Sequence, residues 1–402
     1  MTIPSDDILE DLDLSRAEPG PGYLERLFFR FNERVPFETA SKILRQATVG
    51  DRAARPRTAD VFWADRLASG TGGTCFARVS AFAALLDDLG FRSRLALGRV
   101  REDFDHAALF VETPGGSVIC DVGFPLPALI PARRGRVETG LGALAVEESS
   151  RGWHIAFEDG VPSGPREVEV FRDPVSDEAY QGRWEETFRP ESKFLKDVIV
   201  HRLFENRRTT FLCGEIRIDD LHSRTQIPLA APRSEALAEI FGIDAEVLDA
   251  AFEIAGDPEP EQAAASVEVY LESPTGADEA FAAISTPEGY RNLLEGVAEV
   301  ATEATGPGFW TARLVSPAGP GGSPAAEIRE SVEADPPART LRIRRGSQET
   351  SYRAEKREGT PWLVRRGVLD GRRMDLLRND SMRGRIAGSL AVDLLGWARR
   401  LG

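Results

Sequence analysis

The segment Gly72-Gly73-Thr74-Cys75 decides the fold, because it leads directly into a run with the apolar spacing of a helix. Thr74 is of a residue type that caps helix N-termini and Gly90 is suited to end a helix, so we predict a helix over residues 75–89. Cys75 then lies in the first turn, where the helix dipole and free backbone N–H groups favour a thiolate. The sequence therefore places a thiol where it can act as a nucleophile.

Two further motifs supply an imidazole and a carboxylate. After the predicted helix, the pattern changes to the alternation typical of strands, which we expect over residues 92–101, 106–113 and 117–121. Pro114-Gly115-Gly116 predicts a hairpin turn between the last two strands. His106 begins one of these strands and Asp121 ends the next, so we expect the two side chains to be neighbours. An activated cysteine needs a base to take its proton and a group to orient that base.

Each of the three residues also has a structural interpretation. Cys75 could be a packed core thiol, and His106 and Asp121 could be ordinary strand-end residues. Their positions at the ends of successive elements favour catalysis. Cys120 alternates with Asp121, so we expect it to face the core. The other histidines show no spacing typical of metal ligands, and we expect no metal.

Composition limits the classes of function. A chain of 402 residues predicts two or three domains. A formal charge of −15 argues against nucleic acid or a membrane surface as partner. Three scattered cysteines do not suit a disulfide framework, so we expect reduced thiols in the cytoplasm. The acidic first fourteen residues do not resemble a signal peptide, and no run is long enough to span a membrane.

A short acidic, proline-broken segment, Gly256-Asp257-Pro258-Glu259-Pro260-Glu261, predicts a linker. We therefore expect a catalytic domain at 1–255, a linker at 256–263 and a second domain at 264–402, all of the α+β class. In the first domain we also expect antiparallel strands at 153–157, 167–171, 198–203, 209–212 and 215–218, and helices at 234–241 and 245–254. In the second we expect a strand at 266–271, short helices at 276–284 and 287–295, and strands at 297–304, 309–315, 325–333, 339–345, 348–356 and 362–369. One long helix at 373–400 closes the chain.

Residues 23–252 resemble the arylamine N-acetyltransferase family, in particular its divergent, amide-synthase-like members. The resemblance rests on Val35-Pro36-Phe37-Glu38, on residues 72–76, on residues 106–112 and on Asp121-Val122-Gly123-Phe124. It implies a helical bundle, a β-barrel and a third α/β lobe, related to papain-like and transglutaminase folds. It also implies ping-pong acyl transfer from coenzyme A to an aromatic amine, with Cys75 as nucleophile, His106 as base and Asp121 as orienting carboxylate.

The chain departs from the family pattern at four places. Thr71 stands where the family usually has Arg, Ala77 where it has Glu, and Val79 where it has Asn. Pro125 follows the third motif where the family has Gly. The Arg, Glu and Asn that the family has at positions 71, 77 and 79 support the site rather than perform its chemistry. The departures therefore bear on substrate and donor more than on the three catalytic residues.

The resemblance also suggests binding residues. Phe37 and Phe124 would form walls of the acceptor pocket, although both could be core residues, and Gly73 and Thr74 would lie beside the substrate. Arg133 and Arg134 belong to a basic cluster that could receive the phosphates of coenzyme A, although such a cluster is often a solvated loop. These assignments are expectations from the pattern of the family.

Residues 264–402 resemble a START-type (SRPBCC, polyketide-cyclase-like) helix-grip domain in the order of their elements. That order is a strand, two short helices, a run of strands and one long helix. The resemblance implies a curved sheet around the long helix, with an apolar cavity that holds a hydrophobic small molecule.

Together these patterns predict an acyltransferase or amide synthase, with a hydrophobic acceptor or product held by the second domain, as would suit secondary metabolism. The donor would be acetyl-CoA or another acyl thioester, with an acyl carrier protein as an alternative carrier, and the acceptor a small amine. Two alternatives stay open: a cysteine hydrolase or transglutaminase-like enzyme that uses the same three residues, and a non-catalytic small-molecule-binding protein.

Overall fold

The computed structural model describes residues 3–158, 166–260, 264–294, 299–315, 327–345, 348–357 and 360–369, together with a few positions between 386 and 401. The chain forms two compact units. The first contains Met1–Leu221 and Leu229–Glu261, and the second contains His222–Pro228 and Gln262–Gly402. The functional domain limits that we predict from the sequence, 1–255 and 264–402, remain predictions.

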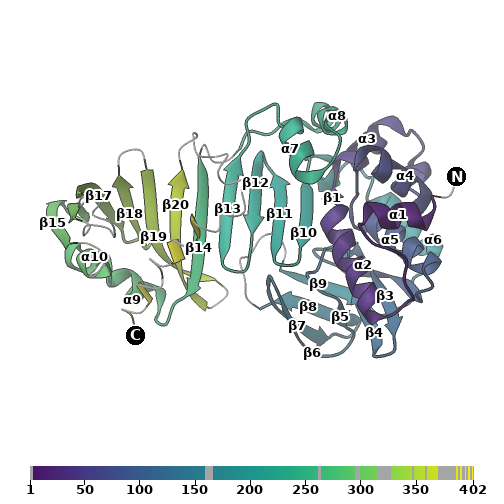
Figure 1. The fold of residues 1–402 in the computed structure, drawn as a ribbon, viewed down its shortest axis with the longest axis horizontal. Helices are drawn as coiled ribbons and strands as arrows, with labels where there is room; N and C mark the ends of the chain where they lie inside the picture. The colour runs from purple at the N-terminus through teal and green to yellow at the C-terminus, as the bar shows by residue number, and fades with distance from the viewer. Residues whose placement is uncertain are drawn as a thin grey trace. The chain divides into compact units, whose positions relative to one another are not determined.

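The first unit begins with a series of helices (Figure 1), four of which share one apolar core. The series comprises α1 (Ser5–Asp11), α2 (Pro21–Arg34), α3 (Ala40–Thr48), the 3-10 turn η1 (Arg52–Ala54), α4 (Ala59–Ser69) and α5 (Cys75–Asp88). Leu24, Leu27, Phe28 and Phe31 recur at helical spacing along α2 and are fully buried. The expected helix after Cys75 is confirmed as α5, which is buried along most of its length between α4 and strands β2 and β3.

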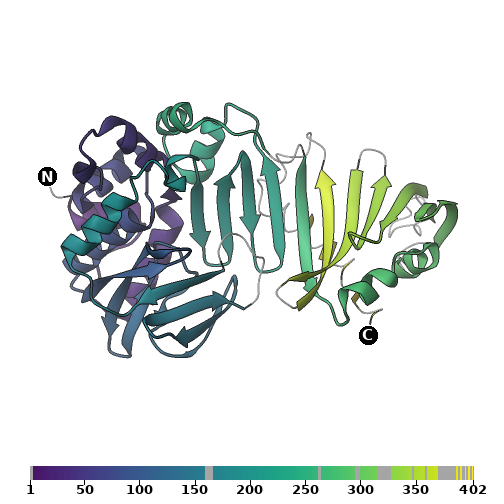
Figure 2. The same cartoon turned by 180° about the vertical axis from the view of Figure 1, so that it is seen from behind.

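An antiparallel sheet of eight strands follows the helices, in the order β5-β4-β3-β2-β9-β8-β7-β6 (Figures 1 and 2). Its strands are β2 (Ser93–Arg99), β3 (Asp103–Thr113), β4 (Gly116–Cys120), β5 (Ile130–Pro131), β6 (Gly135–Thr139), β7 (Gly142–Glu148), β8 (Gly152–Phe157) and β9 (Glu167–Phe171). The predicted hairpin joins β3 to β4, with Thr113 paired to Gly116. This hairpin places the start of β3, which carries His106, beside the end of β4, which Asp121 follows.

A second group of strands in this unit carries the segment with Phe37. It comprises β1 (Phe37–Glu38), β10 (Val200–Phe204), β11 (Arg207–Leu212) and β12 (Glu215–Asp219), each antiparallel to the next. The remaining helices of the unit are α6 (Asp177–Glu186), the 3-10 turn η2 (Lys193–Leu195), α7 (Ser234–Phe241) and α8 (Ala245–Ala255). Gly242 ends α7 in the left-handed conformation, as its residue type predicts. The mixture of helices and antiparallel sheet agrees with the α+β expectation.

The second unit is an antiparallel sheet with two short helices. Its strands follow the order β13 (Ser223–Pro228), β14 (Ala265–Glu272), β20 (Thr360–Leu369), β19 (Gln348–Arg357), β18 (Thr340–Arg345), β17 (Glu327–Asp335), β16 (Phe309–Val315) and β15 (Glu299–Gly306). The helices are α9 (Ala277–Ala282) and α10 (Pro287–Leu293). Most of these elements match the expected ranges within a few residues, but the sequence analysis did not predict β13.

The long helix expected at 373–400 lies mostly outside the described residues, as does the segment 261–263 of the expected linker. At the positions that are described, Leu390, Leu394 and Trp397 are helical and buried. Trp397 donates a hydrogen bond from Nε1 to the carbonyl of Ala280 at 3.2 Å and packs edge-on against Tyr352. A helix-grip arrangement therefore stays a prediction. Among the described helices, none has the length and apolarity needed to cross a membrane.

Candidate active site

Cys75 is the first residue of α5 and is only 6% exposed. Thr74 occupies the N-cap position with extended backbone, but its side chain makes no capping hydrogen bond, in contrast to what its residue type suggests. The first backbone N–H groups of a helix have no partner within it, and they favour negative charge nearby. The Cys75 thiol also contacts the carbonyl of Asp105, with 3.9 Å between Sγ and oxygen.

His106 and Asp121 are hydrogen-bonded partners, as expected from the hairpin. His106 lies in β3 and Asp121 directly follows β4, and Nε2 of the ring lies 2.8 Å from Oδ2 of the carboxylate. The other carboxylate oxygen accepts hydrogen bonds from the backbone N–H groups of Gly123 at 3.0 Å and Phe124 at 2.8 Å. Asp121 is fully buried and held on both oxygens, so its carboxylate fixes the orientation of the imidazole.

The charge on His106 is set by its neighbours. Burial lowers the pKa of His106, but the charge of Asp121 and hydrogen bonds with Asp121 and Cys75 raise it to about 10. Since Nε2 is engaged by Asp121, Nδ1 is the ring nitrogen available to the thiol. The site therefore stabilises an imidazolium beside Cys75, which is the partner that a thiolate requires.

Glycines allow the three segments to approach closely. A Cβ at position 123 would lie 2.4 Å from the carbonyl of Ala107, 2.9 Å from Cβ of Cys75 and 3.0 Å from Cε1 of His106. A Cβ at position 72 would overlap the carbonyl of Pro36. A side chain at position 123 would push apart the segments that carry the triad of Cys75, His106 and Asp121, and one at position 72 would displace the segment of Pro36, so both glycines have a steric role.

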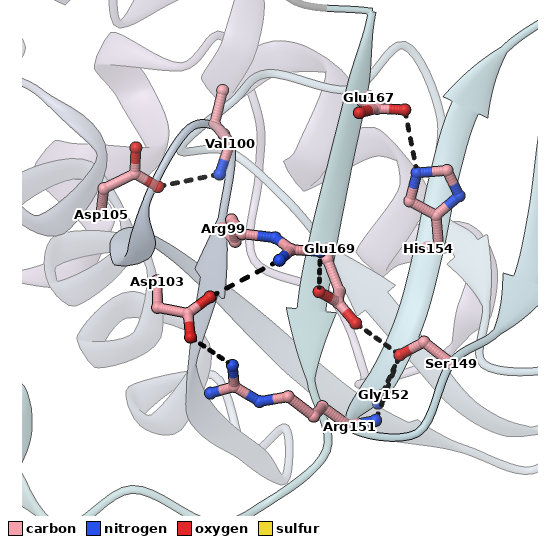
Figure 3. A network of polar contacts seen from close by, with 10 residues as sticks. All are labelled: Arg99, Val100, Asp103, Asp105, Ser149, Arg151, Gly152, His154, Glu167 and Glu169. Carbon is pink, nitrogen blue, oxygen red and sulfur yellow. Dashed lines mark hydrogen bonds and ion pairs between the residues drawn. The ribbon is translucent and has the colours of Figure 1, made fainter.

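The turn before His106 is held by a polar network, shown in Figure 3. Asp105 accepts hydrogen bonds from the backbone N–H groups of Val100, Arg101 and Glu102 at 2.8–3.2 Å. Asp103 pairs with Arg151 at 2.6 Å (Figure 3). Because Asp105 precedes His106 and its carbonyl contacts Cys75, this network fixes the start of β3 next to the thiol.

The same network extends to β9. Arg99 pairs with Glu169 at 2.8 Å, and Glu169 also accepts a hydrogen bond from the hydroxyl of Ser149 (Figure 3). His154, one of the histidines without the spacing of metal ligands, pairs with Glu167 on the exposed part of the sheet at 3.1 Å. These contacts tie β8 and β9 to the loop that carries Asp105.

The sequence analysis missed Arg78, which is almost completely buried. Its guanidinium donates to the carbonyl of Val122 at 2.8 Å, to the carbonyl of Val35, and to Oδ1 of Asn32 at 2.8 Å. Burial lowers the pKa of Arg78 to about 9, while Asp121 and Glu38 act to raise it, so it remains a cation at neutral pH. Arg78 thus joins α5 to the segment after Asp121 and to the segment before Phe37.

Arg57 contacts the segment that precedes Cys75. Its guanidinium donates to the carbonyl of Gly72 and pairs with Asp65 at 3.1 Å. Glu38 is also fully buried, and it accepts hydrogen bonds from the backbone and hydroxyl of Ser41 at 2.8 and 2.5 Å.

The expected binding residues fall into two groups. The backbone of Phe37 bridges to Gly73, and its ring packs edge-on against Phe194 at 5.6 Å. Phe124 packs edge-on against the His106 ring, with 6.3 Å between ring centroids. Gly73 and Thr74 are buried directly before Cys75. Gly73, Thr74 and Phe124 therefore lie beside the triad, and Phe37 contacts the same segment through its bridge to Gly73.

Arg133 and Arg134 lie farther along the sheet. Both are exposed in the turn between β5 and β6, and the neighbouring Ala132 pairs with Ser117 at the start of β4. Asp121 follows the opposite end of β4, which at about 3.3 Å per residue is roughly 13 Å away. The structure therefore keeps these two arginines away from direct contact with the triad.

The remaining cysteines and acidic residues do not form a metal site in the part of the chain that the structure describes. There, no group of three or more His, Cys, Asp or Glu side chains is arranged to hold an ion. Cys120 is fully buried, and burial raises the pKa of its thiol well above the usual value. Cys120 is thus a core residue, as its alternation with Asp121 predicts.

Comparisons with known proteins find similarity over part of the chain. Residues 22–139 match a family model described as N-acetyltransferase. No curated protein matches the chain. Among solved structures, a single-substitution variant of an arylamine N-acetyltransferase of Mycobacterium smegmatis is 21% identical with a TM-score of 0.55, covering 63% of this chain and all of that one.

Two further structures have the same fold. The arylamine N-acetyltransferase of Mycobacterium tuberculosis is 20% identical with a TM-score of 0.51, covering 59% of this chain and 91% of its own. An arylamine N-acetyltransferase of Bacillus cereus, described as having a Cys-His-Glu catalytic triad, is 16% identical with a TM-score of 0.52, covering 60% of this chain and all of that one. At these identities the similarity shows the fold.

Proposed function

We propose that this protein is an acyltransferase that moves an acyl group from a thioester to an amine through Cys75. The observation that carries the proposal is the contact of three buried groups at one helix start: Cys75, His106 and Asp121. These positions support the roles of nucleophile, base and orienting carboxylate, and the His106–Asp121 pair supplies a stable proton acceptor.

The first half of the reaction follows from these positions. His106 holds the proton of the thiol, and the Cys75 thiolate attacks the carbonyl carbon of the thioester, so that a new C–S bond forms. The old C–S bond then breaks, and the leaving thiol takes the proton from His106. The product of this half is an acyl-enzyme on Cys75 and a free thiol.

The second half reverses the proton's route. An amine attacks the acyl carbon while His106 takes a proton from its nitrogen, and the bond to Cys75 breaks to leave an amide. Asp121 stabilises the imidazolium in both halves. The backbone N–H of Cys75 is in the first turn of α5 and has no helical partner, so it can donate to the oxyanion that forms in each half.

The acceptor that suits this site is an aromatic amine. Phe37 and Phe124 approach the triad from two segments and are half-buried, so they would contact an aromatic ring. Acetyl-CoA is the proposed donor, because residues 22–139 match the N-acetyltransferase model. Arg133 and Arg134, one strand length away, would meet the phosphates of such a donor. An acyl carrier protein is the alternative carrier.

We further propose that the region 264–402 is a helix-grip domain that holds a hydrophobic acceptor or product, as in an amide synthase of secondary metabolism. The second unit has an apolar interior that includes Trp310, Tyr352 and Trp397. Buried Tyr290 donates to buried Glu330 at 2.5 Å, and Glu330 pairs with the exposed Arg345 at 2.5 Å. A buried polar pair beside an apolar interior can orient such a ligand.

The test of the proposed function is the amine dependence of thioester turnover. We expect the purified full chain to release free coenzyme A from acetyl-CoA faster when an arylamine such as aniline is added. Cys75→Ala should abolish this release, while Cys213→Ala, which changes a half-buried cysteine, should preserve it.

Other outcomes identify the alternatives. Release that is independent of any amine but requires Cys75 would indicate a cysteine hydrolase. No release with any donor, together with slow modification of Cys75 by iodoacetamide, would indicate a non-catalytic binding protein. Either result would overturn the transferase assignment.

A further inference from the structure

A basic pocket adjoins the start of α5, separate from the residues that form the triad. Its cationic lining comes from Lys42 and Arg45 in α3 and from Arg55 and Arg57 in the loop before α4. The backbone of Gly73 and Thr74 closes it next to Cys75. The pocket is narrow and partly open to solvent, so it can admit a small group and not a whole coenzyme.

The cations of this pocket have little internal charge compensation. Within the described residues, Arg57 alone among the four forms an ion pair, with Asp65 at 3.1 Å. Arg45 donates to the carbonyls of Ala54 and Arg55, and the Arg55 guanidinium donates to backbone carbonyls and to the side-chain amide of Gln46. The pocket is therefore strongly positive in a chain whose formal charge is −15.

Lys42 has the least compensation of the four. It is 4% exposed, and its ammonium donates to the neutral hydroxyl of Thr187 at 2.7 Å. Phe188 packs under the ammonium at 4.8 Å. A buried ammonium without a carboxylate is costly, so it favours an external anion or the loss of its proton.

The residue type at position 42 is informative. The chain has four lysines among its 50 basic residues. An arginine cannot give up its proton at neutral pH, whereas burial lowers the pKa of Lys42 to about 7, with Cys75 acting to raise it. Lys42 can therefore be neutral while the pocket holds no anion and become charged when one binds.

We propose that this pocket binds an anionic oxygen group, a phosphate or a carboxylate, carried by a substrate of the neighbouring site. Lys42 and Arg45 would contact the anion, while Arg57 holds the carbonyl of Gly72 and shapes the wall. Trp184 and Phe188 form the apolar side of the pocket. The assignment of the anion to a substrate rests on the proposed function, but anion binding itself does not.

Calorimetry with inorganic phosphate and with benzoate tests the binding directly. At pH 8, in two buffers of different ionisation enthalpy, the full chain should bind at least one of these anions and take up close to one proton, because the anion returns the proton to Lys42. The groups that face this ammonium are Cys75 from α5 and the arginines of the pocket. Proton uptake separates this site from ordinary surface association.

Three variants make the test specific. Lys42→Met should weaken anion binding at least about tenfold and abolish the proton uptake. Lys42→Arg should retain binding without proton uptake, which also covers the case in which Lys42→Met fails to fold. Lys196→Met, which removes an exposed lysine, should leave both unchanged. No saturable binding in the wild type, or unchanged binding and uptake in Lys42→Met, would overturn the proposal.

Kinetic comparison identifies which substrate carries the anion. If the donor carries it, Lys42→Met raises KM for acetyl-CoA at least about tenfold and leaves KM for acetyl-pantetheine unchanged. If the acceptor carries it, the variant raises KM for 4-aminobenzoate and not for aniline. Equal changes in KM for acetyl-CoA, acetyl-pantetheine, 4-aminobenzoate and aniline would contradict the proposal that the pocket binds an anionic group of a substrate. If calorimetry shows anion binding but the chain shows no turnover, the proposed function is wrong and the anion-binding proposal stands.

Discussion

The first turn of α5 borders two charged environments. The complete environment contains its own counter-charge, and the incomplete environment does not. Beside Cys75, His106 has its counter-charge built in, because Asp121 lies 2.8 Å from its ring. Beside Gly73 and Thr74, Lys42 has only a hydroxyl and aromatic rings as partners. A buried charge with its own counter-charge can serve as permanent machinery, whereas one without a counter-charge is suited to an external ligand.

The largest expected effect comes from removing the counter-charge of the complete environment. In Asp121→Asn the pKa of His106 should fall because the neighbouring carboxylate is lost, and acyl transfer should slow by about 10³–10⁴-fold. Stopped-flow release of coenzyme A measures the rate. The matched control is Glu167→Gln, which breaks the exposed His154 pair and should leave the rate within about twofold. A rate in Asp121→Asn as high as in the control would contradict the role of Asp121.

Arg78 tests whether the complete environment depends on a buried cation. Arg78→Met leaves the carbonyls of Val35 and Val122 without their donor, so the free energy of unfolding should fall by about 3 kcal/mol. Urea unfolding measures this loss. Arg26→Met, on the exposed part of α2, should change it by less than about 0.5 kcal/mol.

A second readout separates positioning from stability. At a temperature where Arg78→Met remains folded, its KM for acetyl-CoA should stay near the wild-type value while kcat falls, and Arg78→Lys should recover part of kcat. Unchanged kcat in folded Arg78→Met would restrict the residue to a structural role.

Gly123 tests the close approach of the three triad segments. Gly123→Ala places a methyl group against the carbonyl of Ala107 and against Cys75 and His106, so it should destabilise the fold by about 1–3 kcal/mol and slow acylation. Gly135→Ala adds a methyl group in open space and is the matched control. Thermal unfolding of both variants measures the difference, and equal stabilities would show that the segments can move apart freely.

The pH dependence of stability compares the two environments directly. The pKa of His106 is raised to about 10, so its contribution to stability is fully present below pH 6.5 and is lost as pH rises toward 10. The pKa of Lys42 is lowered to about 7, so above pH 7 the unfolded chain binds more protons at this position and stability rises with pH. As pH rises above 7, the His106 contribution to stability therefore falls while the Lys42 contribution rises.

A variant that lacks one of these contributions should therefore show the pH dependence of the free energy of unfolding that the other group produces. Between pH 7 and 8.5, the free energy of unfolding of Lys42→Met should fall by up to about 1.4 kcal/mol per pH unit relative to the wild type. In Asp121→Asn, the free energy of unfolding should instead rise with pH relative to the wild type. Urea unfolding at both pH values measures these slopes, and parallel slopes in all three proteins would show that the two groups do not titrate as described.

The complete environment was predictable from the sequence because its residues are local to motifs. Cys75 ends the short motif Gly72-Gly73-Thr74-Cys75, and the short hairpin between β3 and β4 fixes His106 next to Asp121. Regular alternation likewise predicted most strands of the second unit. The basic pocket was not predictable, since Lys42 and Arg57 come from segments whose meeting depends on tertiary packing.

Other misses have similar physical causes. Arg78 was not singled out because an arginine at helical spacing is usually exposed, and only the fold shows which carbonyls it meets. Strand β13 has no strong alternation, and its pairing with β14 is set by the rest of the sheet. The side-chain cap expected of Thr74 does not form.

The central claim is that Cys75, activated by His106, carries the acyl group. Intact-protein mass measurement after brief exposure to acetyl-CoA without amine, followed by peptide mapping, tests it most directly. We predict one acetyl group on Cys75 that disappears when an arylamine is added and never forms in Cys75→Ala. No adduct on the wild type, or an adduct that persists in Cys75→Ala, would contradict the account.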